Sequence, residues 1–153
     1  DVVGHNNLAN VAKAQLEKIG LKVDLQPMDW QTLVARRAKK DPIDKGGWSA
    51  FFTSWGSTDV LNPASTAFLN AACDKATFGW PCDAELEKLV AEGGATIDRE
   101  ARKAAYDKAI EIASAKAYWM PMNTYVNTYA FSKQLQFKTF PDELPRFYFA
   151  KWK

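Results

Sequence analysis

The first third of the chain alternates between two hydrophobic periodicities, and this alternation constrains the fold more than any other feature. Apolar residues recur every three or four positions over 7–19, which predicts a helix with one buried face that ends at Gly20. The segment 21–26 alternates strictly between apolar and polar residues and predicts a half-buried strand. A second helix is predicted over 29–40 with Asp29 as its cap, and 48–54 has the aromatic, apolar composition of a buried strand. This order predicts an α/β fold with a mixed sheet flanked by helices.

Loop and cap residues divide the remainder of the chain. The segment 56–61 is predicted to be a loop, after which Asn62 and Pro63 open a short helix. Asp83 is predicted to cap a helix that stops at 93–94, where two glycines stand together. A long helix follows over 98–116, and the aromatic-rich remainder from 118 to 153 predicts further strands.

The composition excludes several classes of function. Twenty Lys and Arg are interspersed with eighteen Asp and Glu, so no basic stripe forms and nucleic-acid binding is not expected. A single His and two Cys are too few for a zinc site built by the protein, because zinc takes three or four N or S ligands. The lone His5 lies near the amino end, which argues against Ser-His or Cys-His catalysis. We therefore expect no metal, no cofactor and no catalytic residue, and one domain spanning 1–153.

The two cysteines, Cys73 and Cys82, enclose a loop. A metal site or a redox pair is one interpretation, and a structural disulfide formed in an oxidising compartment is the other. The disulfide is favoured because the spacing is not CxxC and no His or further Cys lies nearby.

The end of the aromatic strand offers a candidate ligand wall. Trp55 is followed at once by Gly56 and by the polar residues Ser57, Thr58 and Asp59. Ligands of α/β proteins bind beyond the carboxyl ends of strands, so Trp55 is a candidate pocket residue, with a place in the core as the equal alternative. By itself Asp59 is typical of a solvated loop or of a turn cap. Farther along, Tyr125 and Asn127 share one face of a predicted strand and are outside candidates for the same wall.

Four stretches, taken in order, resemble one protein family. They are AKAQLEKIGLKVDLQPMDWQTLVARR, WSAFFTSWGSTDVLNP, CDKATFGWPCDAELEKLV and WMPMNTYVNTYAFSKQLQ, and they cover essentially the whole chain. Together they resemble the carboxy-terminal lobe of the extracellular solute-binding proteins that serve dipeptide and oligopeptide ABC importers. The chain departs from the pattern at Asn62, where Asp is common, and in the distance from Trp55 to Pro63, which is one residue longer.

The resemblance implies a fold, a function and a location. It implies one lobe of a two-lobed periplasmic-binding-protein-like fold of class II, with the amino-terminal lobe absent from these 153 residues. It implies non-catalytic capture of a peptide or similar small solute for delivery to an ABC importer permease, in the periplasm. The resemblance also implies the disulfide between the two cysteines. It further implies a role for Asp59, which stands four residues before Pro63, where peptide-binding members carry the acidic partner of the ligand's amino group.

Two alternatives to this function stay open at the level of sequence. One is a self-standing aromatic-rich module that binds carbohydrate or another protein. The other is an enzyme that uses a carboxylate pair such as Asp83 and Glu85 for glycoside hydrolysis, but carboxylates are expected in the first turn of a helix in any case.

Overall fold

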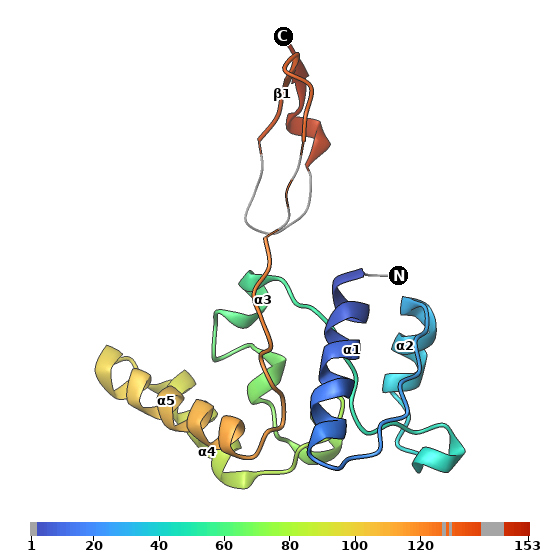
Figure 1. Ribbon diagram of the computed structural model, residues 1–153. Coiled ribbons are helices and arrows are strands. Elements are labelled where there is room, and N and C mark those ends of the chain that lie inside the picture. Colours follow the sequence, from blue (N-terminus) through green and yellow to red (C-terminus); the bar gives the residue numbers. More distant parts are fainter. Residues whose placement is uncertain (1–2, 127, 129, 139–145) are drawn as a thin grey trace. The chain divides into compact units, whose positions relative to one another are not determined.

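The computed structural model describes residues 3–126, 128, 130–138 and 146–153. Its contacts divide the chain into two compact units, Asp1–Ser54 and Trp55–Lys153. The described part is largely helical, with one small sheet (Figure 1). Its α-helices are α1 (Val3–Lys18), α2 (Trp30–Arg37), α3 (Ser57–Val60), α4 (Ala84–Ala95) and α5 (Arg99–Ala115), and its strands are β1 (Leu135–Gln136) and β2 (Lys151–Trp152).

The first unit contains α1 and α2, and both helices were predicted. Helix α1 begins at Val3, so Asn6 and Asn7 lie inside the helix and do not cap it. It ends as predicted, because Gly20 adopts a φ of 89°, a left-handed conformation that terminates helices. Helix α2 is capped by Asp29, whose carboxylate accepts the backbone N–H of Thr32 at 2.9 Å and its hydroxyl at 2.6 Å.

Arg36 joins α2 to the loop that follows it. Its Nε donates to the carbonyl of Gly46 at 3.3 Å and its Nη2 to that of Gly47 at 2.9 Å, while Nη1 donates to the side chain of Gln26. Gly47 is required here, because a Cβ at this position would lie 1.9 Å from the carbonyl oxygen of Asp41. The basic end of α2 is therefore partly structural.

The predicted mixed sheet is absent from the part of the chain that the structure describes. Segments 21–26 and 48–54 have no strand ladder there, and β1 and β2 form one two-stranded antiparallel sheet that pairs Leu135 with Trp152. The expected strand beginning near Tyr125 is also unpaired as far as it is described, and residues 127, 129 and 139–145 lie outside the description. Alternation specifies which side chains would share a face, but a strand also needs a neighbouring backbone to pair with.

The second unit is built on α4 and α5, which pack side by side (Figure 1). Ala109 and Ala113 of α5 are fully buried, and their small side chains let the two helices approach closely. Helix α4 has the predicted cap, since Asp83 accepts the backbone N–H groups of Glu85 and Leu86 at 3.1 Å. Helix α5 is capped by Asp98, which accepts the N–H of Ala101 at 2.8 Å. The buried core cluster comprises Leu69, Ala71, Leu86, Ala109 and Ala113.

Helix α4 does not stop at its two glycines, as the sequence had suggested, but continues to Ala95. Gly93 faces Tyr106 of α5, and a Cβ there would lie 2.7 Å from the tyrosine ring. Gly93 therefore serves close packing between the helices, a role that overrides its tendency to end them.

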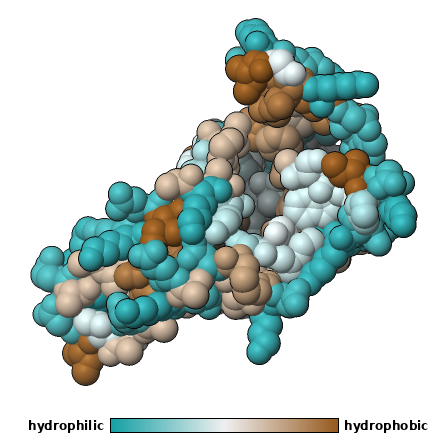
Figure 2. Space-filling view, turned by 90° about the horizontal axis from the view of Figure 1, so that it is seen from below, coloured by the Kyte–Doolittle hydropathy of each residue, from teal (hydrophilic) through white to brown (hydrophobic). Residues whose placement is uncertain are grey.

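Large apolar side chains remain exposed in the described part of both units. Figure 2 shows such residues on one face as separate brown areas among hydrophilic teal ones. Examples with more than half of their surface exposed are Val11, Ile19, Ile43, Leu61, Ile97, Phe147, Tyr148 and Trp152. Among the described residues, no helix has the length and apolar character needed to span a bilayer.

Candidate functional site

The predicted ligand wall lies on a single helical turn of the second unit. The segment after Trp55 was expected to be a loop, but Ser57–Val60 forms the short helix α3. Gly56 precedes this turn, and its carbonyl accepts the backbone N–H of Asp59 at 3.0 Å. Ser57 and Asp59 favour such a turn, because small polar and acidic residues are well suited to the first turn of a helix.

Trp55 is part of an aromatic ladder, Trp55–Phe68–Trp119. The rings of Trp55 and Phe68 meet edge to face with centroids 5.3 Å apart, and Phe68 stacks on Trp119 at 4.5 Å. Trp55 nevertheless remains 41% exposed. One side of its ring is therefore held by packing while the rest is open for contact, a combination that suits a ligand platform.

Asp59 carries a carboxylate with no hydrogen-bond or ionic partner among the described residues. Its Oδ2 lies 3.2 Å from the position that a Cβ on Gly56 would occupy, so the side chain folds back over the start of the turn. Ser57 and Thr58 are exposed on the same turn. The turn thus presents one negative charge and two hydroxyl groups.

A turn that begins at Asn62 connects α3 to Phe68 of the aromatic ladder. The side-chain oxygen of Asn62 accepts the backbone N–H of Ala64 at 3.1 Å, and its carbonyl accepts those of Ser65 and Thr66 at 3.1 and 3.0 Å. Thr66 is buried, and its hydroxyl accepts the backbone N–H of Phe68 at 3.4 Å. The expected helix is therefore a turn followed by the 3-10 turn Ala67–Leu69.

Of the two outside candidates, the structure describes one. Tyr125 is 50% exposed and has no hydrogen bond or ring contact with another described residue. Asn127 lies outside the described residues. Phe68 and Trp119 could not be predicted from the sequence, because the contacts of the ladder depend on how segments distant in sequence pack together.

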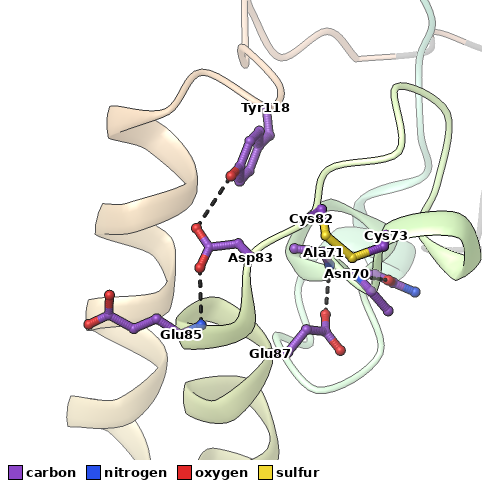
Figure 3. Close-up of a disulfide and its surroundings, with 9 residues drawn as sticks. Asn70, Ala71, Cys73, Cys82, Asp83, Glu85, Glu87 and Tyr118 are labelled. Carbon is purple, nitrogen blue, oxygen red and sulfur yellow. Dashed lines mark hydrogen bonds between the residues drawn. A yellow bond between two sulfur atoms is a disulfide. The ribbon is translucent and has the colours of Figure 1, made fainter.

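The predicted disulfide between Cys73 and Cys82 is present (Figure 3). The two ends of its loop are also joined by the backbone, since the N–H of Cys73 donates to the carbonyl of Pro81 at 3.0 Å. Both sulfur atoms are used in the bond, so this pair does not form a metal site. No cluster of three or more His, Cys, Asp or Glu capable of holding a metal occurs among the residues described.

Asp83, which follows Cys82 of the disulfide in sequence, accepts several hydrogen bonds. Besides capping α4, its carboxylate accepts a hydrogen bond from Nζ of Lys116. It also accepts one from the hydroxyl of Tyr118 at 3.3 Å (Figure 3). The Lys116 hydrogen bond and the backbone N–H of Leu86 hold the pKa of Asp83 below its usual value. The carboxylate of Asp83 is thus occupied in capping α4 and in binding Lys116 and Tyr118, which gives it a structural role.

Comparison with known proteins finds relatives of one kind. The chain is 32% identical over 140 residues to a Sinorhizobium fredii protein described as a "probable peptide ABC transporter periplasmic-binding protein". It is 28% identical to a "probable di/tripeptide-binding protein" of Pseudomonas aeruginosa and 30% identical to the periplasmic oligopeptide-binding protein of Haemophilus influenzae. No protein-family model matches the sequence.

These matches cover 80–88% of this chain but only 22–25% of the relatives. The chain thus spans about a quarter of the length of the curated relatives that it matches. The similarity extends through both compact units and therefore includes α3, the disulfide loop and the α4–α5 pair. Over most of its length, this chain is therefore similar to a segment of the periplasmic-binding proteins of peptide ABC transporters.

Proposed function

We propose that this chain is the carboxy-terminal lobe of a two-lobed periplasmic receptor that captures a peptide or similar small solute without catalysis. The amino-terminal lobe and an ABC importer permease are its partners in this proposal. The observation that carries it is the partly exposed ring of Trp55, followed four residues on by the Asp59 carboxylate, which has no partner among the described residues. The relatives of the chain are named as binding proteins for peptides or of peptide transporters.

The proposed wall consists of Trp55, Ser57, Thr58 and Asp59. A peptide's terminal ammonium group pairs with the carboxylate of Asp59, and the exposed part of the Trp55 ring covers apolar atoms of the solute. Closure of the second lobe removes water from the pair, which strengthens their attraction because the local dielectric constant falls. Tyr125 and Asn127 remain proposed secondary contacts.

The class II lobe architecture is part of the same proposal. The unpaired segments 21–26 and 48–54 have the hydrophobic patterns of strands, and their backbone groups need partners if they are to be buried. We infer that they join a mixed sheet when the rest of the polypeptide is present. The exposed apolar residues of both units support this, since a domain of this size seldom leaves so many uncovered.

Calorimetry with short peptides tests the function, using the complete two-lobed protein and the isolated 153-residue chain in parallel. The complete protein is expected to bind a peptide, while the isolated chain binds it weakly or not at all, because one wall buries only part of a ligand. Micromolar binding by the isolated chain would contradict the two-lobed proposal.

The alternative of a self-standing module rests on the same exposed Trp55, since sugars also stack on tryptophan. An oligosaccharide panel added to the calorimetry separates the two candidates. Binding of an oligosaccharide by the isolated chain, with no peptide binding by the complete protein, would favour the module.

A further inference from the structure

A recess of about 380 Å³ lies in the second unit. The turn at Asn62, the glycines Gly93 and Gly94 of α4, and Arg102 and Tyr106 of α5 line it. Its volume is within the range of small-molecule sites, roughly 300–1,000 Å³. Neither Trp55 nor Asp59 contributes to its lining.

Two side chains of the recess are hydrogen-bond donors without partners. The guanidinium of Arg102 forms no ion pair or hydrogen bond with any residue that the structure describes, and neither does the hydroxyl of Tyr106. The ring of Tyr106 is buried, but its hydroxyl lies 3.8 Å from the position that a Cβ on Gly94 would occupy. Asn62 adds a third donor, because its side-chain oxygen is engaged with Ala64 and its amide nitrogen is not.

The two glycines keep the recess open. At Gly93 a Cβ would lie 2.7 Å from the Tyr106 ring, so a larger residue would push that ring away. At Gly94 a larger side chain would extend toward the Tyr106 hydroxyl and occupy the space beside it. The helix α4 thus leaves room for a ligand where most helices would place side chains.

Arg102 is the charged residue among those that line the recess. The carboxyl end of α4 lies nearby and carries partial negative charge, but two of its carbonyls are already capped by Thr96. The Thr96 hydroxyl donates to the carbonyl of Glu92 at 2.6 Å, and its N–H donates to that of Gly93 at 3.4 Å. Asp98, the residue that caps α5, accepts the backbone N–H of Ala101.

We propose that this recess binds the carboxylate group of a small organic acid. The planar guanidinium of Arg102 presents two parallel N–H groups that match the two oxygens of a carboxylate, and Tyr106 donates a further hydrogen bond. The proposal is independent of the peptide wall, because it uses different residues and a different ligand group.

The test is a two-dimensional NMR titration of the 153-residue chain with sodium acetate near pH 7. Acetate replaces chloride at constant ionic strength, and acetamide serves as the uncharged counterpart. The amide signals of Gly93 and Gly94 are expected to shift saturably with acetate and to stay unchanged with acetamide. Absence of a saturable shift with acetate would overturn the proposal.

Three variants locate the effect. Arg102→Gln and Tyr106→Phe should each weaken acetate binding, the first by at least about tenfold because it removes a charge-assisted hydrogen bond. Arg99→Gln is the matched control, since Arg99 is the first residue of α5, is exposed and does not line the recess. Equal loss in Arg99→Gln and Arg102→Gln, or no loss in Arg102→Gln, would show that acetate binds elsewhere.

Discussion

Nζ of Lys116, at the carboxyl end of α5, donates a hydrogen bond to the carboxylate of Asp83, the residue that caps α4. This contact joins the two helices that form the core of the second unit. It also places a cation beside a carboxylate that is 5% exposed, so each group stabilises the charged form of the other. The pKa of Asp83 is lowered and that of Lys116 is raised by their hydrogen bond.

This pair predicts that the second unit loses stability in acid. A carboxylate with a lowered folded-state pKa stabilises the fold above its unfolded value of 3.8, and the effect is lost as the pH falls through the folded-state value. We therefore expect the melting temperature to fall with pH below about 5. Circular dichroism melts across pH 2–7 measure this.

Asp83→Asn should lower the melting temperature at neutral pH and flatten its decline in acid. Glu111→Gln on α5 is the control, because it removes a negative charge from an exposed position. A decline of the same size in Asp83→Asn and in the unsubstituted protein would mean that other carboxylates cause the acid loss.

Substitution of the two glycines of α4 should have opposite effects. Gly93→Ala puts a methyl group 2.7 Å from the ring of Tyr106, and such overpacking costs about 1–3 kcal/mol, more than the helix propensity gained. Gly94→Ala meets only an ordinary contact at 3.8 Å and should stabilise by about 0.5–1 kcal/mol. Urea unfolding of both variants decides the matter, and equal stabilisation by both would refute the packing role of Gly93.

Loss of the disulfide between Cys73 and Cys82 should destabilise the second unit by about 2–3 kcal/mol, the loop-closure value for about ten residues. The measurement is urea unfolding of the double variant Cys73→Ser, Cys82→Ser. Alkylation of the unreduced protein under denaturing conditions should label neither cysteine. Two labelled thiols in protein purified from an oxidising compartment would contradict the assignment.

Phe68→Ala should weaken solute binding even though Phe68 is not proposed to touch the solute, because it holds Trp55 through their edge-to-face contact. Trp55→Ala should cost about 2–4 kcal/mol of binding free energy in the complete protein. Phe68→Leu keeps apolar bulk and is expected to retain part of the affinity. If Trp55→Ala left the affinity for the solute unchanged, Trp55 would have a purely structural role.

Local features of this fold were predictable from the sequence, and long-range pairings were not. The caps at Asp29 and Asp83 followed from residue type and position, because a cap is satisfied within a few residues of itself. The hydrogen bond between Lys116 and Asp83 joins residues 33 positions apart, and no local pattern marks it. Gly93 was misinterpreted as a helix stop because its packing partner, Tyr106, belongs to another helix.

In the candidate site, too, local features were predictable from the sequence and long-range contacts were not. Composition located the polar turn after Trp55, although it forms the helix α3 where a loop was expected. The ladder through Phe68 and Trp119 depends on tertiary packing. The strand pattern of 48–54 was recognisable, but pairing requires a neighbouring strand that the described residues do not provide.

Asp59 is proposed to bind the terminal ammonium group of a peptide in the complete protein, for which two lobes are proposed. Calorimetry with one peptide in free and amino-acetylated forms, on the unsubstituted protein, Asp59→Asn and the control Glu111→Gln, tests it most directly. Asp59→Asn is expected to lose about 2–5 kcal/mol of binding free energy for the free peptide and little for the acetylated one. Glu111→Gln is expected to bind both forms of the peptide as the unsubstituted protein does. Equal affinity of Asp59→Asn and the unsubstituted protein for the free peptide would contradict the account.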